Sequence, residues 1–126
     1  TRGAIIRTLS QIRATNALKA SRIQGMGLGQ RGGDALSGFP MLIKTDGLLA
    51  AGAFAVELKL NRESKQPGAL LIMTAIATHL AEVGIATART AEDLVRELAT
   101  AKDASQLRRA TAEALAYLNY LKRFVA

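Results

Sequence analysis

The last twenty residues of the chain carry its clearest hydrophobic pattern. Apolar or small side chains recur there at alternating spacings of four and three residues. A helix that turns about 100° per residue places such positions along one side. We therefore expect a final helix with one buried side, containing Leu107, Thr111, Ala114, Leu118, Leu121 and Val125.

The opposite side of this predicted helix is basic and smooth. It carries Arg108, Asn119 and Arg123, with Arg109 close by, and the positions between them on that face are Ala112 and Ala116. Small side chains between basic ends allow another backbone to approach closely. The pattern alone fits either a binding surface or an ordinary solvated exterior.

Helical spacing of apolar residues predicts four further helices upstream. We expect them over residues 4–23, 40–60 and 67–83, with a short one after Thr90. Pro40 and Pro67 suit first helical turns, because backbone N–H groups have no acceptor within the helix there and proline, which lacks this group, loses no hydrogen bond. Thr90 is expected to cap the short helix. For the final helix, Asp103 or Ser105 is the expected cap, with Gln106 three positions after Asp103.

Glycines mark two other places along the chain. Residues 25–38 contain six glycines, which predict a mobile loop because ordering glycine costs conformational entropy. Gly47 and Gly52 instead lie inside the predicted helix over residues 40–60. Each costs roughly 1 kcal/mol relative to alanine in a helix. We therefore expect a neighbouring backbone to pack closely against them.

The composition agrees with a helical fold. The 126 residues are 49% hydrophobic but only 4% aromatic, and no long run of alternating β-branched residues predicts a sheet. A domain of this length buries about two thirds of the surface that its unfolded chain exposes. We expect residues 1–126 to form one all-α domain, a bundle of about five helices with a mobile loop near residues 25–38.

The sequence contains no recognisable catalytic arrangement. It has no cysteine, no P-loop and no pair of carboxylates at motif spacing. His79, the only histidine, is expected to be a packed or surface residue. We expect a protein that is not an enzyme and binds neither metal nor cofactor.

The longest apolar run, residues 69–77, is too short to cross a bilayer. No signal peptide is visible in the sequence. We therefore expect a cytoplasmic protein without a membrane partner.

The net charge of +7 is concentrated at the two ends of the chain. Residues 1–44 hold seven Lys or Arg against one acid, and residues 105–126 hold four against one. Residues 45–104, by contrast, hold six against eight. Basic surfaces attract polyanions, of which nucleic acid is the commonest, although a membrane or an acidic protein also suits such charge.

Two stretches resemble a known family. Residues 39–54 read Phe-Pro-Met-Leu-Ile-Lys-Thr-Asp-Gly-Leu-Leu-Ala-Ala-Gly-Ala-Phe, and residues 107–124 contain Leu-Arg-Arg-Ala-Thr, Glu-Ala-Leu and Tyr-Leu-Lys-Arg-Phe. Both resemble the Cmr-type small helical subunit of type III-B CRISPR effector complexes. Asp46 stands where that family usually has Asn, Leu107 where an aromatic residue is common, and the glycine-rich loop replaces a more ordinary basic segment.

This resemblance implies a non-catalytic role in antiviral defence. Copies of the family's small subunit stack head to tail beside the other effector-complex subunits that hold the guide RNA. Their basic face lines the path of the target RNA, where it contacts phosphates without reading sequence. The RNA-binding residues that the resemblance carries over to this chain are Lys44, Arg108, Arg109, Lys122, Arg123 and, from a shorter match at residues 11–14, Arg13.

Other functions stay open from the residues themselves. One is an architectural bundle whose basic face docks an acidic protein partner. Another is a nucleic-acid-binding bundle outside CRISPR, without sequence preference. For binding to double-stranded DNA we find no helix-turn-helix spacing.

Overall fold

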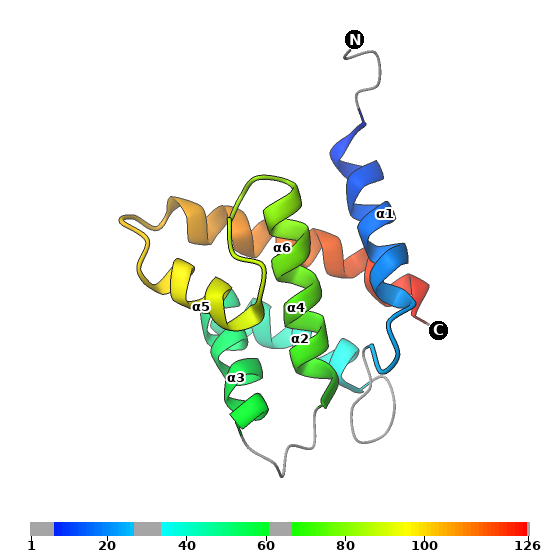
Figure 1. The fold of residues 1–126 in the computed structure, drawn as a ribbon, viewed down its shortest axis with the longest axis horizontal. Helices are drawn as coiled ribbons and strands as arrows, with labels where there is room; N and C mark the ends of the chain where they lie inside the picture. The colour runs from blue at the N-terminus through cyan, green and yellow to red at the C-terminus, as the bar shows by residue number, and fades with distance from the viewer. Residues whose placement is uncertain (1–6, 27–33, 61–66, 126) are drawn as a thin grey trace.

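Six α-helices and no strand make up the described part of the computed structural model, which covers residues 7–26, 34–60 and 67–125 (Figure 1). The predicted all-α bundle is confirmed, with six helices in place of about five. In chain order they are α1 (Leu9–Ser21), α2 (Asp34–Asp46), α3 (Leu48–Leu60), α4 (Pro67–Glu82), α5 (Ala91–Ala99) and α6 (Ser105–Phe124).

Helix α4 lies at the centre of the bundle and packs against all five other helices (Figure 1). Its side chains Ile72, Met73, Ile76 and Leu80 are fully buried. A helix that is apolar most of the way round needs such cover on every side. It ends as predicted, because Gly84 follows with a φ of +80°, a conformation in which glycine is unstrained.

The helix predicted over residues 40–60 is in fact two helices, and this prediction was wrong. Gly47 adopts a φ of +91° and separates α2 from α3. Its N–H donates to the Ile43 carbonyl at 2.8 Å, while its carbonyl accepts from the Ala51 N–H at 3.1 Å. Gly47 therefore allows the chain to change direction sharply between α2 and α3. It makes no close packing contact, since no neighbouring atom lies within 4 Å of the position that a Cβ would take.

Helix α2 begins earlier than the sequence predicts. Pro40 was expected in the first turn, yet α2 starts at Asp34 and contains the proline in its interior. Leu36 and Phe39 explain the extension, since only 4% and 3% of their surface is exposed. Burial of two large apolar side chains offsets the hydrogen bond that the proline cannot donate. Residues 34–38 of the predicted loop are thus helical, and residues 27–33 lie outside the described part.

Helix α1 starts later than predicted, at Leu9, and the preceding residues 1–6 lie outside the described part. A capping box fixes this start. The Thr8 hydroxyl accepts from the Gln11 N–H at 3.1 Å, and the Gln11 side chain accepts from the Thr8 N–H at 2.8 Å.

The start of α6 also differs from the prediction. Ala104 occupies the cap position without a side-chain hydrogen bond, although Asp103 accepts from the Ser105 N–H at 2.7 Å. Gln106 does not complete a capping box. Its amide donates instead to the Ile85 carbonyl and to Glu97, and so ties α6 to the connection before α5 and to α5 itself. The cap predicted at Thr90 is confirmed, since its hydroxyl accepts from the Asp93 N–H.

The buried side of α6 is wider than predicted. Ala114, Leu118 and Leu121 are buried as expected, whereas Leu107, Thr111 and Val125 are only half-buried. The buried set extends around the helix toward α1, which packs mainly against α6. It includes Ala110, Glu113 and Tyr117.

No helix within the described ranges is long and apolar enough to cross a membrane.

Gly52 does pack closely, but against side chains and not against the backbone that we expected. A Cβ at this position would lie 2.7 Å from Cε of Met73 and 2.9 Å from Cγ2 of Val95. In Gly52→Ala, the higher helix propensity of alanine should raise the free energy of unfolding by about 1 kcal/mol. Overpacking should lower it by about 1–3 kcal/mol. We predict that Gly52→Ala lowers the free energy of unfolding by about 1 kcal/mol in urea denaturation.

Gly38 provides the matched control for this prediction. It is exposed within α2 and has nothing within 4 Å of its Cβ position. Gly38→Ala should therefore raise the free energy of unfolding by up to about 1 kcal/mol. If Gly52→Ala stabilised the protein as much as Gly38→Ala, the close packing at Gly52 would be wrong.

Candidate nucleic-acid interface

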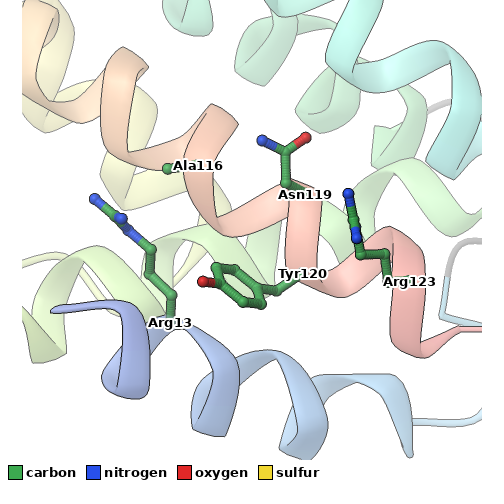
Figure 2. A pocket seen from close by; sticks show the side chains of 5 residues that line it. All are labelled: Arg13, Ala116, Asn119, Tyr120 and Arg123. Carbon is green, nitrogen blue, oxygen red and sulfur yellow. The ribbon is translucent and has the colours of Figure 1, made fainter. Parts of the chain in front are cut away.

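A hollow of about 490 Å³ lies between α1 and α6, and we call it the α1/α6 groove (Figure 2). Arg13 reaches it from α1, and four residues of α6 complete its lining. In Figure 2 the ring of Tyr120 lies between the two arginine side chains. The lining residues are Arg13, Ala116, Asn119, Tyr120 and Arg123.

A second hollow of about 410 Å³ shares Arg13 and includes Arg109, Ala112 and Glu113 of α6. Together the two hollows follow one side of α6, from Arg109 to Arg123, at helical spacings of three and four residues. Fourteen residues of helix separate these two arginines, a length of about 21 Å. Arg109 and Arg123 therefore mark the two ends of this side of α6, and Arg13 of α1 reaches its middle.

Arg13 is fixed by an ion pair with Glu113. Its Nε donates to Oε2 at 2.6 Å and its Nη2 donates to Oε1 at 2.7 Å. Such a two-point contact holds the guanidinium plane in one orientation. The carboxylate is buried, with 5% of its side chain exposed, whereas 21% of the arginine side chain is exposed. One end of the guanidinium therefore faces the groove, and no described residue accepts a hydrogen bond from Nη1.

His79 of α4 completes this cluster in the protein core. Its Nε2 lies 2.9 Å from Oε2 of Glu113, and its Nδ1 lies 2.9 Å from Nδ2 of Asn16. An amide nitrogen can only donate, so Nδ1 accepts and Nε2 carries the proton that is donated to Glu113. The imidazole stacks on Tyr117 with ring centroids 4.5 Å apart. His79 is completely buried, which confirms the expectation of a packed histidine.

These contacts control the ionisation of Glu113. Burial alone raises the pKa of a carboxyl, but the hydrogen bonds from Arg13 and His79 outweigh it, so the pKa of Glu113 lies below its ordinary value. Glu113 is therefore a carboxylate at neutral pH.

Burial also raises the pKa of the Tyr117 hydroxyl, which stays protonated. Nowhere in the described ranges do three His, Asp or Glu side chains gather as metal ligands would.

The structure brings three of the six predicted RNA-binding residues together. Arg13 and Arg123 line the α1/α6 groove, and Arg109 lines the adjacent hollow. The other three are exposed but line neither hollow: Lys44 in the last turn of α2, and Arg108 and Lys122 on α6.

Sequence reasoning missed two parts of this site. Tyr120 is half-buried and lines the groove, and nothing in the sequence distinguishes it from a packing residue. Glu113 was not singled out, although it anchors Arg13. An unusual signal for it was present, since Glu113 is the only acid of α6 and stands among alanines on a side close to the buried one.

We predict that Glu113→Gln lowers the free energy of unfolding by about 2 kcal/mol at pH 7, because the charge-assisted hydrogen bonds of the carboxylate are lost. A carboxyl whose pKa is lowered on folding stabilises fully above its ordinary pKa of 4.5 and loses that effect as pH falls through the folded pKa. The difference between the native protein and the variant should therefore shrink below about pH 4.5. Urea denaturation across this pH range measures it.

Glu92→Gln is the control, because Glu92 belongs to an exposed pair with Arg96 on α5. Exposed pairs of this kind contribute about 0–1 kcal/mol. The pKa of Glu97 is also lowered, since four hydrogen bonds outweigh its burial, but this effect is common to all three proteins and cancels. A constant difference between native protein and Glu113→Gln down to acid pH would contradict the assigned network.

Comparisons with known proteins agree with this architecture. The family model described as CRISPR-associated protein (Cas_Cmr5) matches residues 9–126. The fold is similar to the X-ray crystal structure of a CRISPR-associated Cmr5 family protein from Thermus thermophilus, with a TM-score of 0.63 and 27% sequence identity over 95% of this chain and 96% of that one. No curated protein matches the chain. The family match spans nearly the whole sequence, and the chain therefore belongs to the Cas_Cmr5 family of CRISPR-associated proteins.

Proposed function

We propose that this chain is a non-catalytic small subunit of a type III-B CRISPR effector complex in the cytoplasm, and that it contacts target RNA phosphates through the basic side of α6. Family membership supports the place in a Cmr-type complex. The observation that carries the RNA contact is the exposed basic side of α6, which continues into the α1/α6 groove.

The charge on this side is not cancelled by neighbouring acids on the same helix. Arg108, Arg109, Lys122 and Arg123 are all exposed, whereas Glu113, the only acid of α6, is buried and paired with Arg13. The positive potential at the surface therefore belongs to the four exposed cations. Lys44 is also exposed, in the last turn of α2.

The side chains between these cations favour contact with a backbone. Ala112 is exposed and Ala116 half-buried, so the surface between the basic residues is low. Arginine and lysine contacts to phosphates hold a strand in place without reading its sequence. Such contact suits a complex in which pairing with the guide RNA reads the target.

Exposed apolar residues support contacts with neighbouring copies and other subunits. Met41 of α2 has 62% of its surface exposed, and Phe54 of α3 and Ile23 after α1 have 40% and 47%. Exposed apolar side chains that gather into a contiguous patch mark protein interfaces. We propose that copies of this chain stack on one another through such surfaces into a filament.

The buried cluster supports a non-catalytic role. A histidine between a carboxylate and an amide resembles a catalytic arrangement, but both ring nitrogens of His79 are hydrogen-bonded and the ring is completely buried. A general base needs access to the proton that it removes. The geometry of this cluster therefore favours structural use.

We predict that Arg108→Ala combined with Arg123→Ala weakens binding to single-stranded RNA and leaves thermal stability nearly unchanged. Both side chains are exposed, so their removal opens no cavity. Each phosphate contact that is lost should reduce the slope of log K against log salt concentration by about 0.7. Fluorescence anisotropy with a labelled oligoribonucleotide at several salt concentrations measures both quantities. For a single subunit we expect weak binding, which the filament strengthens through multivalency.

Arg89→Ala combined with Lys102→Ala removes the same charge from exposed positions in the connections on either side of α5, and should change RNA binding little. If both double variants weakened binding equally, net charge and not this surface would be responsible. The architectural alternative predicts instead that Arg108→Ala with Arg123→Ala abolishes capture of a protein partner in pull-downs without RNA.

A further inference from the structure

We propose that the α1/α6 groove is a nucleotide subsite for single-stranded RNA, which takes phosphates at Arg13 and at Arg123 and a base against the ring of Tyr120 between them. This inference rests on the proposed function. It adds a base contact to the phosphate contacts of that function.

The two arginines give the groove its affinity for a phosphate. Arg123 is exposed at the groove's edge, and Arg13 enters from the opposite helix. Glu113 already fixes the guanidinium of Arg13, so a ligand need not order that side chain and saves the associated entropy. Nη1 of Arg13 remains to donate to a phosphate oxygen.

Tyr120 provides a surface for a base. It is half-buried, and its ring lies between the two arginines in Figure 2. Phe124 lies beside it, with ring centroids 6.3 Å apart and the planes inclined by 38°. This neighbour limits the movement of Tyr120, and a ring held beside cations suits base stacking, which any of the four bases can make.

Asn119 and Ala116 complete a lining that matches a nucleotide better than a simple acid. The exposed amide of Asn119 offers donors and an acceptor, which suit a base edge or a ribose hydroxyl. Ala116 leaves the floor low. A carboxylate of an acidic protein needs only the arginines, whereas a nucleotide uses the cations, the amide and the ring. The volume of about 490 Å³ lies within the range of small-molecule sites.

The second hollow extends the path of the strand along α6. Arg109 lines it on the far side of Arg13, so the next phosphates along the RNA follow the axis of α6 from Arg123 toward Arg109. On this path the strand passes Arg13, which lines both hollows. Base contact is confined to the end of this path that holds Tyr120.

The test compares Tyr120→Leu with Tyr120→Phe on two ligands, a short oligouridylate and an abasic strand of equal length. The full-length chain is titrated at low salt with each strand. Tyr120→Leu should weaken binding of the oligouridylate about tenfold, because base stacking on the ring is lost. It should leave the abasic strand and the salt slope unchanged. Tyr120→Phe keeps the ring and should bind both strands as the native protein does.

Several outcomes would overturn the subsite. An equal loss on both strands would make Tyr120 a structural residue, and an unchanged affinity for oligouridylate would remove it from the site. If Arg108→Ala with Arg123→Ala abolished binding to polyglutamate without weakening binding to RNA, the groove would be assigned to an acidic protein. If Tyr120→Leu does not fold, irradiation of the native chain with oligouridylate containing 4-thiouridine decides, since the adduct should form at Tyr120 and adducts only elsewhere would contradict the subsite.

These outcomes are distinguishable from failure of the proposed function. If the proposed function is wrong, Arg108→Ala with Arg123→Ala leaves the affinity for both the oligouridylate and the abasic strand unchanged. If only the subsite is wrong, that double variant still weakens binding to both strands while the Tyr120 variants do not discriminate between them.

Discussion

The burial of Glu113 is the constraint on which the arrangement of α1, α4 and α6 depends. A carboxylate with 5% of its side chain exposed loses most of its hydration, which costs several kcal/mol unless other groups replace the water. Arg13 from α1 and His79 from α4 supply those hydrogen bonds, and Asn16 from α1 satisfies the other nitrogen of the histidine. The network therefore fixes the position of α1 along α6 more specifically than apolar contacts alone would do.

The groove is a consequence of this same network. Arg13 is held at its inner side by Glu113 and faces the groove with its outer side, so one residue joins the core to the surface. Its charge is partly neutralised by the pair. The arginines at the two ends, Arg109 and Arg123, are exposed and carry most of the potential that a polyanion would experience. Attraction at the ends and a fixed donor in the middle favour an extended strand over a single small anion.

Local pattern predicts the parts of this structure that depend on neighbours in sequence. The basic side of α6 was predictable because helical periodicity alone places Arg108, Asn119 and Arg123 together. The pairing of Arg13 with Glu113 was not, because a hundred residues separate them and no spacing rule connects them. At Gly47 the signal was present in the Asp-Gly pair, but the apolar run through residues 40–60 favoured one continuous helix. The conformation of Gly47 and the burial of Leu36 depend on tertiary packing, which the local sequence pattern does not determine.

Stability alone does not explain why such a network occupies this position. Replacement of a buried ion pair by well-packed apolar residues is often neutral or even stabilising, because charges lose hydration when they are buried. An apolar set at residues 13, 79 and 113 would contribute a comparable free energy to the packing of α1 on α6, although it would fix the position of α1 less specifically. It would also remove the oriented donor from the centre of the groove and leave Arg109 and Arg123 without a cation between them. The network is therefore better explained by the surface that it positions than by the free energy that it contributes.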